Sequence, residues 1–348
     1  MEFGNILVRA TNWVGDAVMS IPALQALRER YPAARITILA MPWVAGLYGR
    51  EPFCDELLPY DLPRGATGFA AKLALARRLQ KRGFDCAVLL PNSFESAAIA
   101  WAARIPVRIG YARDGRSSLL TIVIERPKPG ETPRHQRFYY LELLKRAGII
   151  DSYPTEKPIR LAGTREYREI GKRRLAEAGA NGPVIGVGPG AAYGGAKRWL
   201  PEHFAEAAAT LGREQGAAVA VFGSKEEFSI CEEVRTKIEE SGARAINFAG
   251  ATTLAEFIEL AAACELFLTN DSGPMHIASA LGVPTVAIFG ATDEEATGPT
   301  GDASRVVREP VECSPCLLRE CPIDHRCMKR VHPERVIAAA EQLMTLKN

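Results

Sequence analysis

The chain has 348 residues, more than one hydrophobic core usually serves, so we expect two domains of roughly 150 to 180 residues each. Its 47% apolar and 24% charged residues exclude long disordered stretches, and a net charge of +2 excludes the basic surface of a general nucleic-acid-binding protein. The sequence has neither a leader pattern nor an apolar run near the roughly 18 residues of a membrane span. We therefore expect a cytoplasmic protein, which could still touch a membrane surface.

Short apolar runs alternate with segments of helical period in the first half, which is the pattern of a parallel sheet with helical crossovers. We expect strands at residues 5–10, 35–40, 85–90 and 107–111. Residues 111–135 are rich in arginine, glycine and proline and are expected to form a loop before a helix from about Phe138 to Ala147.

The same alternation restarts after a connection near residues 150–182. Strands are expected at residues 183–190, 217–223, 244–250, 266–270 and 285–290, with helices between them. The pattern predicts an α/β fold of two doubly wound, Rossmann-like halves, over residues 1–180 and 181–330, with a last helix in 331–348. Ligands of such sheets bind at the carboxyl ends of the strands, in the crevice between the halves.

One strand-to-helix corner, "LTNDSGPMHIAS" at residues 268–279, combines an acid, a hydroxyl, a glycine and a histidine. Pro274 suits the first helical turn, and Asp271 or Ser272 suits the N-cap. Exposed N–H groups and the helix dipole favour an anion there. Because a carboxylate would repel phosphate, Asp271 suits sugar hydroxyls better. A capped helix with a hydrogen-bonded His276 is the alternative interpretation.

The first half repeats this design in "TNWVGDAVMS", where Asp16 follows Gly15 beyond the first strand. A sheet of this kind presents its chemistry at that edge. A helix cap would also explain a lone aspartate. Two such corners facing one crevice favour the functional interpretation more than either corner does alone.

The glycine-rich segment "GVGPGAAYGGAKRW" at residues 186–199 follows a strand, but its spacing matches neither the dinucleotide fingerprint nor a P-loop. It offers backbone that a ligand can approach at Gly190, followed by Lys197 and Arg198, which can bind phosphate. A glycine turn with two solvated cations explains the same residues. The chain contains no Asp-x-Asp pair, so the sequence does not indicate a Mg²⁺ diphosphate clamp.

Four cysteines, Cys313, Cys316, Cys321 and Cys327, fall within fifteen residues. Thiolates at such spacing could hold structural zinc or iron, although the pattern departs from the usual two C-x2-C pairs. Free or regulatory thiols are the alternative, and disulfides fit a reducing compartment less well.

Six blocks of the sequence carry a family resemblance. They are, in chain order, "NWVGDAVMSIPALQALRERYP", "LLPNSFESA", "GPGAAYGGAKRW", "FGSKEE", "NFAG" and "TNDSGPMHIASALGVPTVAIFG". Together they resemble the ADP-heptose:lipopolysaccharide heptosyltransferases, glycosyltransferase family nine. The "PNSF" and "AKRW" blocks are most similar to the type II members, and the six blocks span most of the chain.

The resemblance implies the two-domain GT-B fold, with the acceptor bound by the first half and ADP-heptose by the second. It implies transfer of L-glycero-D-manno-heptose to the heptosyl-Kdo2-lipid A inner core of lipopolysaccharide, with inversion at the anomeric carbon and no cofactor required for the chemistry. The last helix of this fold often crosses back and could pack on the first half. A lipid-anchored acceptor would bring the protein to the inner face of the cytoplasmic membrane.

The resemblance also implies roles for single residues. Asp16 would be the general base on the acceptor hydroxyl, and Lys197 the cation that neutralises the departing ADP. Glu227 would bind the ribose, with Glu226 as the alternative candidate, and Asp271 would bind the heptose hydroxyls. The other donor contacts are expected at Gly190, Arg198, Ser224, Ser272, Gly273 and His276. The acceptor contacts are expected at Asn92, Ser93, Arg113, Arg116, His135 and Arg137.

Two alternatives remain open on the sequence. The first keeps the fold and changes the acceptor, as in heptosyltransferases I and III or another ADP-heptose-dependent transferase. The second is a non-catalytic protein that binds a nucleotide sugar. Such a protein has no need of a base at Asp16, so that residue discriminates between enzyme and binding protein.

Overall fold

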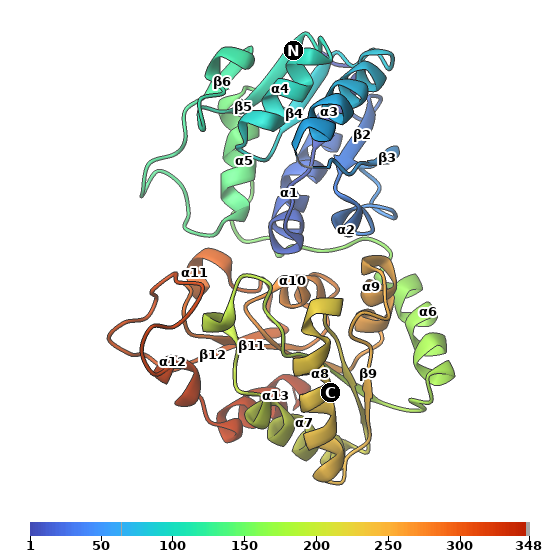
Figure 1. Cartoon of the computed structure of the whole chain (residues 1–348), viewed down its shortest axis with the longest axis vertical. Coiled ribbons are helices and arrows are strands. Elements are labelled where there is room, and N and C mark those ends of the chain that lie inside the picture. Colours follow the sequence, from blue (N-terminus) through green and yellow to red (C-terminus); the bar gives the residue numbers. More distant parts are fainter. Residues whose placement is uncertain (64, 346–348) are drawn as a thin grey trace. The chain divides into compact units, whose positions relative to one another are not determined.

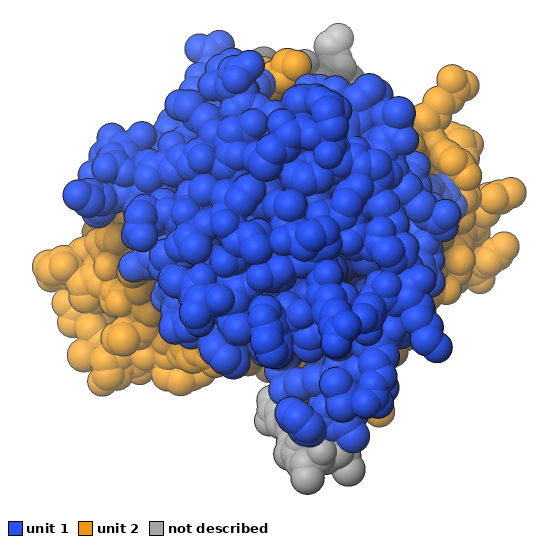
Figure 2. Space-filling view, turned by 90° about the horizontal axis from the view of Figure 1, so that it is seen from above, with its two compact units in different colours: residues 1–156 blue, residues 157–348 orange. Residues whose placement is uncertain are grey.

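The computed structural model describes residues 1–63 and 65–345, and the chain folds as two compact units. Residues 1–156 form the first unit and residues 157–348 the second, coloured blue and orange in Figure 2. The division falls inside the connection expected near residues 150–182. Which substrate each unit binds stays a prediction.

Each unit contains a six-stranded sheet in which all paired strands are parallel. The first sheet, in the order β3-β2-β1-β4-β5-β6, contains β1 (Asn5–Arg9), β2 (Arg35–Ala40), β3 (Glu56–Pro59), β4 (Cys86–Leu89), β5 (Val107–Tyr111) and β6 (Ile122–Ile124). The second, in the order β12-β11-β10-β7-β8-β9, contains β7 (Val184–Gly188), β8 (Ala218–Val221), β9 (Ala245–Asn247), β10 (Leu266–Asn270), β11 (Thr285–Phe289) and β12 (Ser304–Arg308). The predicted α/β class with two doubly wound sheets is confirmed.

Helices connect the strands and cover the sheets (Figure 1). Those of the first unit are α1 (Val14–Arg30), α2 (Pro42–Ala45), α3 (Gly65–Gln80), α4 (Phe94–Ala102) and α5 (Arg137–Arg146), with the 3-10 turn η1 (Ser117–Leu119). Those of the second are α6 (Thr164–Glu177), α7 (Pro201–Gln215), α8 (Phe228–Glu240), α9 (Leu254–Ala262), α10 (Gly273–Ala280), α11 (Glu294–Thr297), α12 (Arg326–Lys329) and α13 (Pro333–Thr345), with the 3-10 turns η2 (Gly195–Lys197) and η3 (Lys225–Glu227).

The central strands of the second sheet are buried along their whole length and are mostly apolar, as parallel strands covered on both faces must be. Gly186 in β7 permits this packing, because a Cβ there would lie 2.4 Å from the ring of Phe267 in β10. The glycine is therefore required by the close approach of two neighbouring strands.

Strand order reverses at one point in each sheet, between β1 and β4 in the first and between β7 and β10 in the second. At such a switch point the connections leave in opposite directions and open a crevice at the carboxyl ends of the two strands. Asp16 and Asn92 follow the two switch strands of the first unit, and Gly190 and Asp271 those of the second. The fold therefore places the predicted residues where each sheet can bind a ligand.

The last helix, α13, packs against α7, β11 and β12 of the second unit. Its buried face is formed by Val336, Ala340 and Leu343. The predicted contact of this helix with the first half stays a prediction. Among the described residues, no helix combines the length and the apolar character needed to cross a bilayer.

Helix α6 lies beside α9 (Figure 1), and Gly171 sits at the contact, where an added Cβ would be 1.9 Å from the carbonyl oxygen of Glu259. Gly171→Ala is therefore expected to force the helices apart and to lower the free energy of unfolding by about 3 kcal/mol, measured by urea denaturation. Gly49→Ala is the control, since no atom lies within 4 Å of its added Cβ. Equal stability of the two variants would contradict this packing.

Candidate functional site

Asn270, the last residue of β10, ties together the two switch strands of the second unit. Its buried amide donates to the carbonyl oxygens of Pro189 (2.8 Å) and Gly190 (3.3 Å), while its oxygen accepts from the backbone N–H of Trp199 (2.9 Å). Both ends of the glycine-rich loop are thus fixed to β10. The ordered ends of this loop hold the backbone around Lys197 in place.

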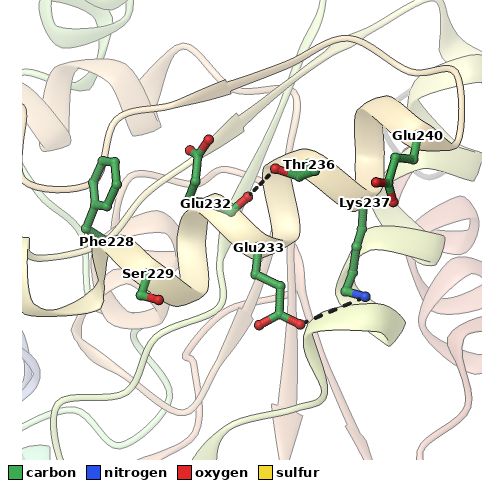
Figure 3. Close-up of a pocket in the computed structure, with 7 residues that line it drawn as sticks. All are labelled: Phe228, Ser229, Glu232, Glu233, Thr236, Lys237 and Glu240. Atoms are coloured by element: carbon green, nitrogen blue, oxygen red, sulfur yellow. Dashed lines mark hydrogen bonds and ion pairs between the residues drawn. The ribbon is translucent and has the colours of Figure 1, made fainter.

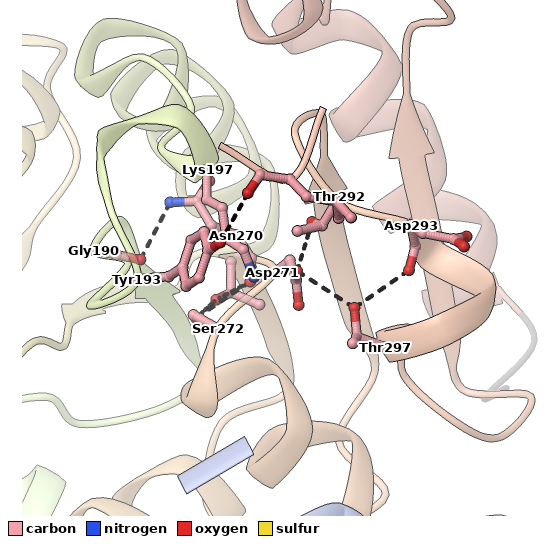
Figure 4. Close-up of polar contacts among 11 residues, drawn as sticks. Gly190, Tyr193, Lys197, Asn270, Asp271, Ser272, Thr292, Asp293 and Thr297 are labelled. Atoms are coloured by element: carbon pink, nitrogen blue, oxygen red, sulfur yellow. Dashed lines mark hydrogen bonds and ion pairs between the residues drawn. The ribbon is translucent and has the colours of Figure 1, made fainter. Parts of the chain in front are cut away.

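Lys197 and Asp271 form the central ion pair of this switch point, with 2.6 Å between Nζ and Oδ2 (Figure 4). The same carboxylate oxygen accepts from the hydroxyls of Thr292 (2.6 Å) and Thr297 (3.4 Å). The side chains of Asp271 and Lys197 are only 4% and 13% exposed. Three donors on one buried oxygen hold the carboxylate, and through it the ammonium group, in one place.

The ion pair determines the net charge at this corner. An isolated carboxylate beside a helix N-terminus would repel a phosphate, but the charge of Asp271 is balanced by that of Lys197. Oδ2 is occupied by Lys197, Thr292 and Thr297, so any contact of this carboxylate with a sugar falls to Oδ1. The sequence indicated a sugar-binding acid, and the structure adds a positioning role toward Lys197.

Helix α10 begins at this corner, and the side chain of its N-cap residue makes no capping hydrogen bond. Ser272 occupies the N-cap position, but its hydroxyl lies near Asn270 O and Thr269 Oγ1, both at 3.3 Å, and the predicted side-chain cap is wrong. His276 is buried in the first turns of the helix. The N-cap side chain therefore leaves the backbone N–H groups of Gly273 and Met275 to other partners, such as an anion.

Glu227 lies against the glycine-rich loop at Gly190. Its carboxylate accepts from the N–H of Ser224 (2.9 Å), in a capping box at the start of η3. A Cβ at Gly190 would lie 2.3 Å from the Glu227 carboxylate, so only glycine permits this approach. Arg198 donates to Ala191 O (3.4 Å) within the same loop. The predicted residues Gly190, Ser224 and Glu227 are thus brought together.

Asp16 lies in the first turn of α1, immediately after β1, and is partly exposed. Tyr140 of α5, which packs along α1, donates a hydrogen bond to it. Burial, and then the charge of Asp16, raise the pKa of Tyr140 well above its ordinary value, so the phenol stays protonated. Tyr140 is a partner of Asp16 that the sequence did not indicate.

The "PNSF" loop after β4 is held from behind by Arg116. This side chain is fully buried and donates to Tyr111 O (2.9 Å), Ser96 Oγ (3.0 Å) and Asn92 Oδ1 (3.4 Å). The expectation that Arg116 contacts an acceptor is therefore wrong for this structure, because its donors serve the loop. Asn92 itself donates to Tyr139 Oη at 2.9 Å.

The other predicted acceptor residues occupy two places. Ser93 caps α4 by accepting from Ser96 N (3.3 Å), and Arg113 is half exposed beside Asp114, at 3.4 Å. His135 and Tyr139 line a surface hollow that also contains the following residues. They are Pro127, Lys128, Pro129, Gly130, Thr132, Pro133, Arg134 and Gln136.

Arg137, next to this hollow, lies over the Phe138 ring at 4.6 Å and donates to Thr155 O, so its guanidinium group is engaged within the unit. The structure therefore brings His135 and Tyr139 to a surface with basic side chains. It places Arg137 in a packing contact beside that surface.

The model of glycosyltransferase family 9 (heptosyltransferase) matches residues 72–326, well over half of the chain. The chain belongs to glycosyltransferase family 9. It is therefore a glycosyltransferase, as its sequence predicts.

This family 9 protein is similar to curated relatives over most of their length. It is 35% identical over 313 residues to lipooligosaccharide heptosyltransferase 2 of Haemophilus influenzae, covering 87% of this chain and 88% of that protein. It is 34% identical over 308 residues to lipopolysaccharide heptosyltransferase 2 of Escherichia coli K12, covering 87% of each. The solved ADP-heptose lipopolysaccharide heptosyltransferase II of E. coli superimposes with a TM-score of 0.83 at 30% identity, covering 100% of this chain and 99% of that one. The predicted GT-B fold is confirmed.

All eight cysteines of this family 9 protein are free thiols. Among the residues described, no three His, Cys, Asp or Glu side chains converge as metal ligands would, so the cysteine spacing has no metal-site counterpart in this structure. Burial, and then the neighbouring thiols of Cys313, Cys321 and Cys316, raise the pKa of Cys327. Cys327 is therefore a thiol and not a thiolate at neutral pH.

A second surface hollow lies along α8 (Figure 3). Its side chains come from one helix and include the pair Glu233 and Lys237, 3.9 Å apart. Acidic groups predominate there, with Glu232 and Glu240 beside Glu233. Such a surface would repel a diphosphate, so we do not assign this hollow to the family's chemistry.

Proposed function

We propose that this family 9 enzyme transfers L-glycero-D-manno-heptose from ADP-heptose to the heptosyl-Kdo2-lipid A inner core of lipopolysaccharide. The observation that carries the proposal is its similarity, over most of the chain, to relatives named heptosyltransferase 2. The buried ion pair beside a helix N-terminus whose N-cap side chain makes no capping hydrogen bond supports it, because both features suit a diphosphate. A lipid-anchored acceptor would bring the enzyme to the membrane surface.

In this proposal Asp16 acts as the general base. Its carboxylate takes the proton of the acceptor hydroxyl while that oxygen forms a bond to the anomeric carbon of heptose. The bond from that carbon to the diphosphate oxygen breaks with inversion, and its electron pair leaves on ADP. Tyr140 positions the carboxylate through the hydrogen bond that it donates.

Lys197 stabilises the negative charge that develops on the departing ADP. Asp271, Thr292 and Asn270 fix the ammonium group and its loop before the reaction, so little reorganisation is needed when the charge appears. The N–H groups at Ser272 and Gly273 receive the diphosphate, with His276 beside them. Glu227, against Gly190, binds the ribose.

The acceptor side is proposed for the first unit. Asn92 and His135, with the half-exposed Arg113, face the anionic inner core. Arg116 acts indirectly, since it holds the "PNSF" loop through Ser96 and Asn92. Ser93 fixes the start of α4 in the same loop.

Incubating the protein with ADP-heptose and defined truncated cores tests the proposal. Product is expected on heptosyl-Kdo2-lipid A, detected by mass spectrometry. Product only on Kdo2-lipid A that lacks heptose would overturn the acceptor and indicate a type I activity. Donor binding without transfer to any core would favour a non-catalytic nucleotide-sugar-binding protein.

Thr292→Val keeps the shape of the side chain and removes the hydroxyl that bonds to Asp271 Oδ2. We expect kcat to fall about tenfold with little change in KM, because the ion pair loses one of its fixed donors. Thr292→Ser restores the hydroxyl and is the matched rescue variant. A valine variant with the kinetics of the wild type would contradict a positioning role for Thr292.

A further inference from the structure

The cysteine-rich segment, residues 313–327, packs on the loop that carries Lys197. The carbonyl oxygen of Arg319 accepts from Ala196 N at 2.9 Å, one residue before the lysine. Gly194 makes this contact possible, because a Cβ there would lie 2.2 Å from the same carbonyl oxygen. The backbone at Arg319 is thus fixed against the donor side of the second unit.

Further bonds hold the same segment in register. Glu320 Oε1 accepts from Gly195 N at 3.0 Å, and Leu317 O accepts from the hydroxyl of Tyr193 at 2.8 Å. Leu317 N donates to Ala291 O at 2.8 Å, in the loop that precedes Thr292. The segment therefore forms hydrogen bonds with both loops that surround the Lys197 ion pair.

Two cationic side chains lie near the aromatic ring of Tyr193. Lys197 Nζ lies 4.9 Å from the ring centroid, and the guanidinium carbon of Arg319 lies 5.2 Å from it. The two charged groups are therefore at most about 10 Å apart. A ring attracts a cation without neutralising it, so Arg319 keeps its full charge.

The two cations differ in their acidic partners. The charge of Lys197 is balanced by Asp271, which leaves the ion pair with no net charge. Arg319 is exposed, and the described residues provide it with no carboxylate at ion-pair distance. Of the two cations near the Tyr193 ring, Arg319 is therefore the one whose charge no described carboxylate balances.

We propose that Arg319 is a second cation of the donor site, which binds the diphosphate of ADP-heptose beside Lys197. The inference rests on the proposed function. A guanidinium group matches two phosphate oxygens as a fork, whereas the ammonium group of Lys197 acts as a point charge. The cysteine-rich segment thereby contributes to the donor site, because it carries Arg319 and fixes its position.

Arg319→Gln tests the proposal, with ADP and adenosine as calorimetric probes of the full-length protein. We expect ADP to bind at least about tenfold more weakly, because a charged hydrogen-bonding partner is lost, and adenosine to bind as it does to the wild type. Arg319→Lys keeps the charge and the ring contact, so its affinity for ADP should lie between those of the wild type and Arg319→Gln. Arg330→Gln, an exposed arginine outside these loops, is the matched control and should leave ADP binding unchanged.

Two results would overturn the proposal. Arg319→Gln could bind ADP as tightly as the wild type, or it could lose affinity for ADP and adenosine equally, which would indicate a distorted loop. Wild-type protein that neither binds ADP nor transfers heptose would instead contradict the proposed function itself. Wild-type transfer together with unchanged ADP binding in Arg319→Gln would contradict only the role of Arg319.

Discussion

Asp16→Asn is expected to lower kcat by about a thousandfold while ADP binding stays the same, because the substitution removes the base and keeps the shape. An asparagine cannot take the proton of the acceptor hydroxyl, so the attacking oxygen keeps it. The hydrogen bond from Tyr140 can still be accepted by the amide oxygen, which preserves the local fold. Steady-state transfer assays and ADP calorimetry measure the two quantities separately.

Asp61→Asn is the matched control, since Asp61 is exposed in the same unit and outside the switch point. It should leave kcat unchanged. Wild-type turnover in Asp16→Asn would show that Asp16 is not the base. If both the wild type and Asp16→Asn bind ADP and neither transfers heptose, the protein is a nucleotide-sugar-binding protein and not an enzyme. Equal loss of kcat and ADP affinity would also contradict the proposal, because Asp16 belongs to the unit proposed to bind the acceptor.

Most of the fold could be predicted from the sequence because buried parallel strands are short apolar runs between helices. The runs at β7, β10 and β11 are of this kind. The sequence did not indicate β3, β6 or β12, which lie toward the edges of the sheets and are three to five residues long with exposed positions. Their pairing depends on neighbours that are distant in sequence, so local pattern alone does not predict them.

The position of a site residue could be predicted where that residue comes shortly after the end of a strand in the sequence. Asp16 and Asp271 are examples, since each follows a switch strand. Partners that come from another element were missed, as Tyr140 and Thr292 were, because only the fold brings them near. Arg116 shows the opposite error: an arginine in a loose, basic segment suggested an exposed anion contact, and its side chain is buried against the loop after β4.

Lys197→Met is expected to lower kcat by about a hundredfold or more and ADP affinity by about tenfold, because the charge that Lys197 meets is largest in the transition state. Methionine keeps an unbranched chain over the Tyr193 ring and removes the ammonium group. Lys172→Met, on the exposed face of α6, is the control and should leave both quantities unchanged. Equal losses of kcat and affinity would make Lys197 a simple binding residue.

The loss in Lys197→Met has a second physical cause that can be separated from catalysis. Without the ammonium group, the buried carboxylate of Asp271 is left with only hydroxyl donors, and a negative charge on it would repel the diphosphate. The double variant Lys197→Met with Asp271→Asn removes that charge. If repulsion is the main effect, the double variant should regain both ADP affinity and kcat; if Lys197 stabilises the departing ADP, affinity should recover while kcat stays low. Recovery of both would contradict the catalytic role of Lys197, since an uncharged site would then release ADP as well as a charged one.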